Sequence, residues 1–107
     1  MALSIDVNQG DVHVTLVLKG DVDTKTAPDL LSQLTSLELH ALEQLRLNLI
    51  EVDFVSSAGL RAIVFAKQKM PHTSVLYLVG PSTEIVETIT KTGLAQAVMI
   101  VQNEDEI

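Results

Sequence analysis

The sequence contains no cysteine. This absence excludes disulfide bonds, thiolate nucleophiles and cysteine-based metal sites. Aromatic side chains make up only 3% of the 107 residues, which is too few rings for a platform that stacks on nucleic-acid bases or sugars. The core must therefore be built from the aliphatic residues that dominate the 47% hydrophobic content.

Basic residues are also scarce. Lysine and arginine together number 7, against 14 aspartates and glutamates, and the formal net charge is −7. Nucleic acids and anionic membranes attract clustered cations, so this excess of acid argues against both as partners. We therefore expect the partners to be proteins.

Long apolar runs are absent as well. No run approaches the roughly 20 residues that span a bilayer, and residues 1–6 lack the basic segment and apolar stretch of a signal peptide. We expect a cytoplasmic protein without membrane insertion. The length fits one domain over residues 1–107, long enough to bury a single core.

Apolar and polar residues alternate over residues 3–7 and again over 12–18, with the turn residues Gln9, Gly10 and Asp11 between them. This pattern predicts a hairpin of two strands. Later apolar runs predict strands at 45–55, 75–79 and 97–101.

Helical periodicity separates these later strands. Thr26, Pro28 and Asp29 mark the start of a first helix, whose inner face is predicted to carry Ala27, Leu30, Leu31, Leu34 and Leu37. A second helix is predicted over 57–69, and a third follows Ser82 and ends at Gly93. The tail, 102–107, is long enough for one helical turn only.

The order of elements predicts an α/β fold. Strand-helix-strand crossovers imply parallel pairing, and the opening hairpin supplies an antiparallel edge. We therefore expect a single domain with a mixed sheet of about five strands, because five apolar runs are present. The helices are expected mainly on one face.

The stretch at residues 53–60 joins the long strand to the second helix and contains two adjacent serines, Ser56 and Ser57. Serine before a helix is commonly just an N-cap. Helical projection places Ser57 on a polar stripe with Arg61 and Gln68, so Ser57 is the serine more exposed to a partner. The amides of the first helical turn would favour an anion here, such as a phosphate on serine.

Other chemistries find little support. Asp21 and Asp23 resemble part of a calcium loop, but its further ligands do not follow, so we expect no metal site. Helix-start electrostatics or a partner contact explains these acids better. The serines lack the leading glycine of the Gly-x-Ser-x-Gly motif, and the three histidines are scattered. We expect no enzyme and no cofactor.

The sequence resembles the STAS family, and within it the bacterial anti-sigma factor antagonists. Three motifs, at residues 18–23, 54–60 and 92–94, carry the resemblance in the right order and spacing over nearly the whole chain. The middle motif departs from the common Asp-Ser-Ser-Gly, because Ser56 stands in place of the acid. Relatives also usually end in a further helix, which this short tail is predicted to lack or curtail.

The resemblance implies a partner switch. The unphosphorylated protein would bind an anti-sigma factor that is also a serine kinase, phosphorylation on Ser57 would break the complex, and a serine phosphatase would restore it. A phosphate beside Asp21 and Asp23 would make an acidic face more acidic and repel the partner. The residues implied to bind the partner are Asp21, Asp23, Thr24, Ser56, Ser57, Ala58, Gly59, Leu60 and Arg61.

Some single-domain STAS proteins are instead regulatory subunits of lipid-transport ATP-binding-cassette complexes, without control by phosphorylation. This is the alternative function that the resemblance leaves open.

Overall fold

The computed structural model describes residues 3–10 and 13–107. The strands in this part of the chain are β1 (Ser4–Gln9), β2 (His13–Val22), β3 (Gln44–Val55), β4 (Val75–Val79) and β5 (Met99–Val101). The helices are α1 (Ala27–Thr35), α2 (Ser57–Lys69) and α3 (Thr83–Lys91), with short 3-10 turns at η1 (Leu39–Ala41), η2 (Leu94–Gln96) and η3 (Glu104–Glu106). The predicted hairpin turn at residues 9–11 lies partly outside the described residues.

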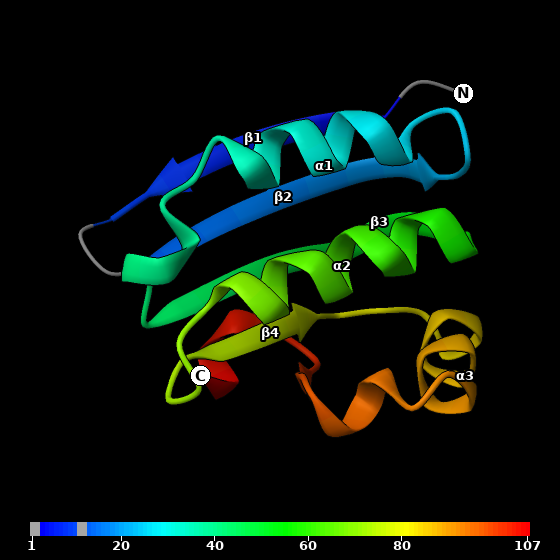
Figure 1. Cartoon of the computed structure of the whole chain (residues 1–107). Coiled ribbons are helices and arrows are strands. Elements are labelled where there is room, and N and C mark those ends of the chain that lie inside the picture. Colours follow the sequence, from blue (N-terminus) through cyan, green and yellow to red (C-terminus); the bar gives the residue numbers. More distant parts are fainter. Residues whose placement is uncertain (1–2, 11–12) are drawn as a thin grey trace.

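The strands form one sheet in the order β1-β2-β3-β4-β5 (Figure 1). β1 runs antiparallel to β2, and each later neighbouring pair is parallel. A helix lies between the strands of every parallel pair along the chain, because parallel neighbours need a crossover connection. The sheet confirms the predicted α/β fold with an antiparallel hairpin at one edge.

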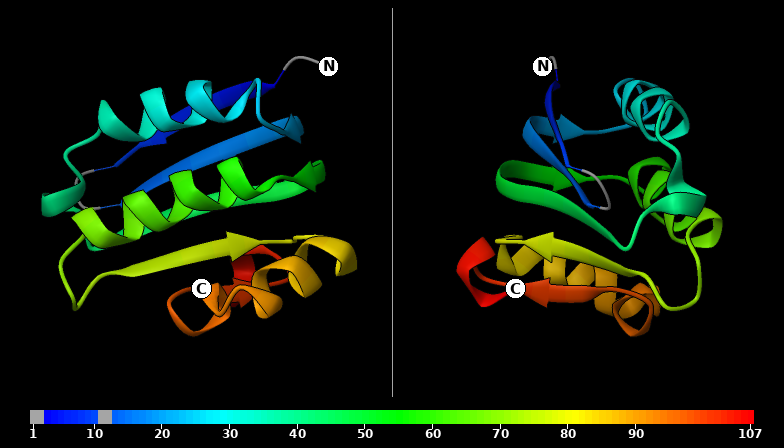
Figure 2. Two further views of the ribbon diagram at one scale, coloured as in Figure 1. Left: turned by 45° about the vertical axis from the view of Figure 1, so that its right-hand side comes forward. Right: turned by 90° about the vertical axis from the view of Figure 1, so that its left-hand side faces the viewer.

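Two helices cover one face of this sheet. The right-hand view of Figure 2 shows α1 and α2 side by side on the same side of the strands. The third helix, α3, lies beyond the carboxyl end of β4 and packs beside β3 (Figure 1). No helix in the described part of the chain is long and apolar enough to span a membrane.

The core lies between the sheet and these helices and is aliphatic, as expected. Leu16, Leu47 and Leu78 are neighbours across β2, β3 and β4, and each is 0% exposed. Ile63 of α2 packs against this layer and is 1% exposed. Full burial of one such side chain stabilises a fold by roughly 1.5–3 kcal/mol.

The long strand β3 does not alternate regularly. Its pairing with β2 shifts register twice, and Ile50, at the first shift, and Phe54, directly after the second, are 57% and 52% exposed. The shifts are β-bulges, each of which adds an unpaired residue to one strand. Beyond the second bulge, Val22 and Val55 are paired and both are buried on the helix side, next to the start of α2.

Some predicted details differ from the structure. Leu31 was expected on the inner face of α1 but is 37% exposed, because it lies at the edge of a groove between α1 and α2. The last strand is shorter than predicted, since η2 occupies residues 94–96 and β5 begins at Met99. Gly93 does end α3 in the left-handed conformation, with φ of 81°.

The C-terminal segment folds back on the face of the sheet opposite α1 and α2, as the right-hand view of Figure 2 shows. Its single 3-10 turn, η3, is preceded by the N-cap residue Asn103, which forms a capping box with Glu106. An ion pair of 3.5 Å joins Glu104 to Arg46 of β3. The tail therefore forms one turn, as predicted.

Candidate functional site

The junction between β3 and α2 holds the two serines, and the structure gives them different roles. The Ser56 amide donates to the Val22 carbonyl over 2.7 Å, which ties this junction to the end of β2. The Ser56 hydroxyl accepts from the Gly59 amide over 3.2 Å. Ser56 has the extended backbone of an N-cap, with φ of −81° and ψ of 174°, and its hydroxyl satisfies one of the amides that a helix start leaves unpaired.

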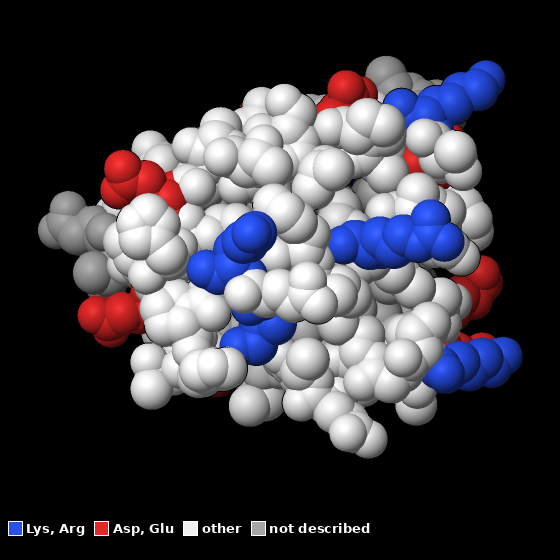
Figure 3. Space-filling model, in the orientation of Figure 1, with Lys and Arg blue, Asp and Glu red and all other residues white. Residues whose placement is uncertain are grey.

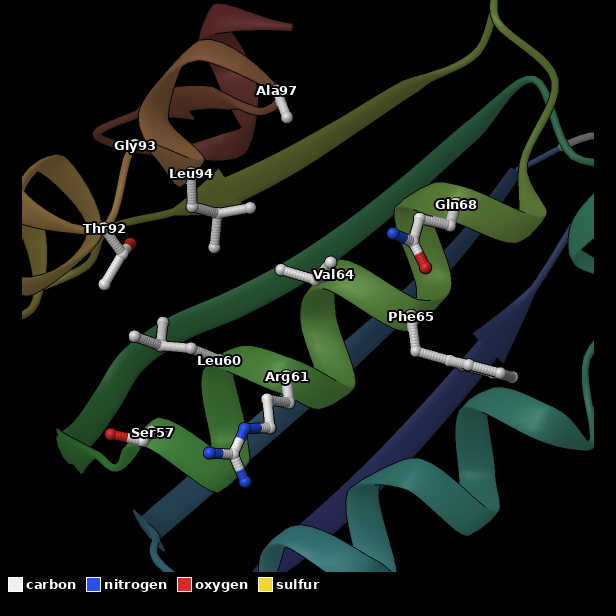
Figure 4. A pocket seen from close by; sticks show the side chains of 10 residues that line it. All are labelled: Ser57, Leu60, Arg61, Val64, Phe65, Gln68, Thr92, Gly93, Leu94 and Ala97. Atoms are coloured by element: carbon white, nitrogen blue, oxygen red, sulfur yellow. The ribbon is translucent and has the colours of Figure 1, made fainter.

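Ser57 is the first residue of α2 and is exposed. Its hydroxyl makes no hydrogen bond to any residue that the structure describes. Figure 4 shows Ser57 and Arg61 one helical turn apart on the open side of α2, with the guanidinium extending back toward the helix start. The stripe of Ser57, Arg61 and Gln68 predicted by projection lines one groove.

Gly59 allows α2 to begin close to the sheet. A Cβ atom at this position would lie 2.6 Å from Val22 Cγ1 and 2.9 Å from Val55 Cγ1. Both distances are shorter than the contacts that Cβ atoms make in folded proteins. The glycine therefore sets the distance between the first turn of α2 and the ends of β2 and β3. This close approach places Ser57, the first residue of α2, beside the ends of β2 and β3.

The loop after β2 is organised by Asp23 and Thr26. One carboxylate oxygen of Asp23 accepts from the amides of Lys25 and Thr26, each over 2.9 Å. The Thr26 hydroxyl, on a side chain that is 7% exposed, lies 2.7 Å from the Asp21 carbonyl and 2.8 Å from the Asp23 amide. The hydrogen bond from the Thr26 amide lowers the pKa of the Asp23 carboxyl. Hydrogen bonds from the Thr26 hydroxyl and the Lys25 amide act in the same direction.

Asp21, at the end of β2, and Asp23, in the loop, do not form one acidic patch. The Asp23 carboxylate is directed into its own loop. Asp21 lies opposite Phe54 in the sheet, and because its neighbour Val22 points toward Gly59 and α2, the alternation of a strand directs Asp21 to the other face. Thr24, in contrast, lines a groove together with Ala58 and Arg61.

Two shallow grooves flank the exposed ridge of α2. The first has a volume of about 520 Å³ and separates α2 from the turn after α3. Figure 4 shows the ten residues that line it, which are Ser57, Leu60, Arg61, Val64, Phe65, Gln68, Thr92, Gly93, Leu94 and Ala97. The second groove, of about 290 Å³, lies between α1 and α2. Arg61 and Phe65 line both.

The charge around Ser57 differs from the acidic face that we expected. The sequence of α2 contains Arg61, Lys67 and Lys69 but neither aspartate nor glutamate. Among the described residues, no acid lines either groove. Figure 3 shows lysine and arginine across the middle of this face and acids gathered at its margins.

The predicted partner-binding residues fall into three groups. Ser57, Ala58, Leu60, Arg61 and Thr24 line the two grooves. Ser56 and Gly59 shape the junction beneath them. Asp21 lies at the end of β2 and Asp23 in the loop that follows, with their carboxylates directed as described above.

Some groove residues were not predicted as part of the site. Phe65, Val64 and the turn at residues 92–94 complete the grooves. The helical period places Phe65 away from the core-facing side of α2. An apolar side chain at such a position is the signal that could have found it, because another surface must cover it. The contribution of residues 92–94 depends on tertiary packing and has no comparable signal.

The described residues offer no centre for metal or histidine chemistry at this position. No three His, Asp or Glu side chains within them lie close enough together to hold a metal ion. None of the three histidines lines the grooves beside Ser57, as far as residues 3–10 and 13–107 show.

Comparison with known proteins places these features in a family. The sequence model of the STAS domain matches residues 4–107. The anti-sigma-B factor antagonist of Listeria monocytogenes is 30% identical over 109 aligned positions, covering 100% of this chain and 96% of the Listeria protein.

Solved structures have the same fold. An anti-sigma factor antagonist from Mycobacterium paratuberculosis superposes with a TM-score of 0.86 at 21% identity, covering 97% of this chain and 89% of that one. The Bacillus cell fate determinant SpoIIAA in its phosphorylated form superposes with a TM-score of 0.72 at 16% identity, covering 96% and 95%.

Proposed function

Because the chain belongs to the STAS domain family, we propose that it is an anti-sigma factor antagonist controlled by phosphorylation of Ser57. The unphosphorylated protein binds an anti-sigma factor that is also a serine kinase, and sigma factor is released. Phosphorylation breaks the complex, and a serine phosphatase restores it. The Listeria relative, an anti-sigma-B factor antagonist aligned over the whole chain, supports this assignment.

The observation that carries the proposal is the division of roles between the two serines. The Ser56 hydroxyl is engaged by the Gly59 amide and is partly buried. Ser57 is exposed at the mouth of a groove. A kinase can therefore reach Ser57 without opening the start of α2.

The fold can accept a phosphate at this position. A phosphoserine carries about −1.5 to −2 charges at neutral pH, and the amide dipoles at the start of α2 favour negative charge. Arg61 stands one turn further along the same side of the helix (Figure 4). The modification therefore changes the surface charge and leaves the fold unchanged.

The proposed contact surface for the anti-sigma factor surrounds Ser57. Thr24, Ala58, Leu60 and Arg61 line the adjoining grooves, and Ser56 and Gly59 fix the local backbone. Asp21 and Asp23 contribute through the backbone that carries Thr24, because the Asp21 carbonyl accepts from the Thr26 hydroxyl and the Asp23 carboxylate accepts from the Lys25 and Thr26 amides. The role is regulatory rather than enzymatic, and the site of action is the cytoplasm, where sigma factors work.

Intact-mass analysis of the protein from its native host, with peptide mapping over residues 53–67, tests the modification. We expect a phosphate-sized addition on Ser57 that varies with growth conditions. Ser57→Ala should abolish the addition, whereas Ser56→Ala should retain it. A protein that is never modified would instead favour the constitutive role of a STAS subunit in a lipid-transport complex.

A further inference from the structure

The exposed side of α2 carries an apolar surface well beyond Ser57. Phe65 lies at its centre and lines three separate hollows, the two grooves described above and a third of about 240 Å³ bounded by Leu39, His40 and Lys69. Val64 also lines the first groove, and Leu31 also lines the second. We call the outer side of α2 from Arg61 to Lys69, together with the three hollows beside it, the Phe65 surface.

The charge of the Phe65 surface is positive although the chain as a whole carries −7. Arg61 borders two of the hollows and Lys69 the third, where its ammonium lies 5.6 Å from the centre of the Phe65 ring. No acid in the described part of the chain lines any of the three. Cations interleaved with apolar hollows favour a partner surface that has the opposite charge and apolar side chains.

We infer that the Phe65 surface docks an acidic segment of a protein partner. Apolar side chains of that segment fill the hollows beside Phe65, and its carboxylates pair with Arg61 and Lys69. A protein segment fits better than nucleic acid or anionic lipid, because only Arg61 and Lys69 among the described lysines and arginines border the hollows, whereas those partners are held by larger clusters of lysine and arginine.

This inference extends the proposed function and rests on it in one respect, that the partner is the same protein that binds at Ser57. Ser57 and Phe65 line one groove, and a displacement of eight positions along the helix separates them by about 12 Å. A phosphate on Ser57 would lie near Arg61 and weaken its attraction for an acidic partner. Neutralisation of the positive potential around Arg61 by the phosphate, rather than added charge on an acidic face, would then explain release.

Photo-crosslinking in the native host tests the inference with the full-length protein. The photoreactive residue p-benzoylphenylalanine replaces Phe65 in one version and Thr24, which lines the groove beside Ala58 and Arg61, in a second. A third version places it at Met99, which is 53% exposed on the opposite face of the sheet. Mass spectrometry then identifies each captured protein and the peptide attached.

We expect positions 65 and 24 to capture the same protein, with an attached peptide at position 65 that is rich in Asp and Glu. Position 99 should not capture it. Arg61→Gln should lower the yield at position 65 about tenfold. Lys19→Gln removes one cation from the opposite face and should leave the yield unchanged.

Capture at position 24 without capture at position 65 would overturn the inference and leave the proposed function intact. A neutral or basic peptide at position 65, or an adduct with nucleic acid or lipid, would overturn it too. If both positions capture one protein through an acidic peptide and that protein is not an anti-sigma factor, the inference stands and the proposed function fails. No capture at either position would reject both.

Discussion

The two adjacent serines show how one backbone position separates a structural side chain from an accessible one. Ser56 directly precedes α2, so its hydroxyl can accept a hydrogen bond from the Gly59 amide in the first turn of the helix. Ser57 is the first helical residue and points outward. The two serines should therefore respond differently to the same substitution.

Ser56→Ala should lower the free energy of unfolding by about 1 kcal/mol, since it removes an N-cap hydrogen bond. Ser57→Ala should leave stability within about 0.5 kcal/mol of wild type, as is usual for exposed positions. Urea unfolding of the two variants measures both values. Equal losses of stability would contradict the different roles of the two hydroxyls.

Asp23 should make stability depend on pH in acid. The pKa of its carboxyl is lowered in the folded protein, chiefly by the Thr26 amide. A lowered pKa means that the group stabilises the fold at pH values above its unfolded pKa, and that this contribution is lost as pH falls through the folded pKa. The loss should therefore occur below about pH 4.

Asp23→Asn tests this expectation, because asparagine keeps the shape of the side chain and cannot titrate. The gap in unfolding free energy between wild type and the variant should be widest near neutral pH and should close as the pH falls below about 4. A gap that stays constant down to pH 2 would show that the carboxylate charge does not matter.

At the scale of elements, α2 serves the core with one side and the grooves with the other. Ile63 is 1% exposed within the core, whereas Val64, the next residue, is half-buried and lines a groove. Neighbouring apolar residues on one helix should therefore differ sharply in their contributions to stability.

Ile63→Ala should reduce the free energy of unfolding by roughly 2–5 kcal/mol, as for other buried aliphatic side chains. Val64→Ala should cost less than about 1.5 kcal/mol, because its side chain already contacts solvent, yet it should weaken partner binding. Chemical denaturation and a binding assay on the same samples separate the two effects. The assignment of Val64 to the contact surface would be wrong if its truncation left binding unchanged.

The elements and their order could be predicted from sequence because the apolar period changes clearly from strand to helix. The predicted helix over residues 57–69 coincides with α2. The bulges of β3 could not be predicted, since Ile50 and Phe54 continue an apolar run whose register depends on the neighbouring strand. Leu31 has the right helical period for burial, but α1 and α2 leave a groove at its position.

Part of the candidate site could be predicted from the helical period of the sequence. Helical period placed Ser57 with Arg61 and Gln68, and the structure shows them along one groove. The charge of the site depends on which face of the sheet Asp21 occupies and on how Asp23 bonds within its loop. Both depend on tertiary structure and are not visible in the spacing of the sequence.

At the scale of the whole molecule, the acidic chain separates its charges. Three of its seven lysines and arginines lie on α2, and the acids that Figure 3 shows on that face lie at its margins. The sheet and its helices support one exposed ridge, the outer side of α2. The proposed switch at Ser57 would require a change in surface charge and no rearrangement of the fold.

The affinity of the protein for the kinase-type anti-sigma factor of its own host, measured with and without phosphoserine at position 57, tests the central claim most directly. Calorimetry with both forms at one salt concentration gives the two dissociation constants. We predict that the phosphorylated form binds at least about tenfold more weakly, with an unchanged circular dichroism spectrum. Equal affinity of the two forms would contradict the proposed switch at Ser57.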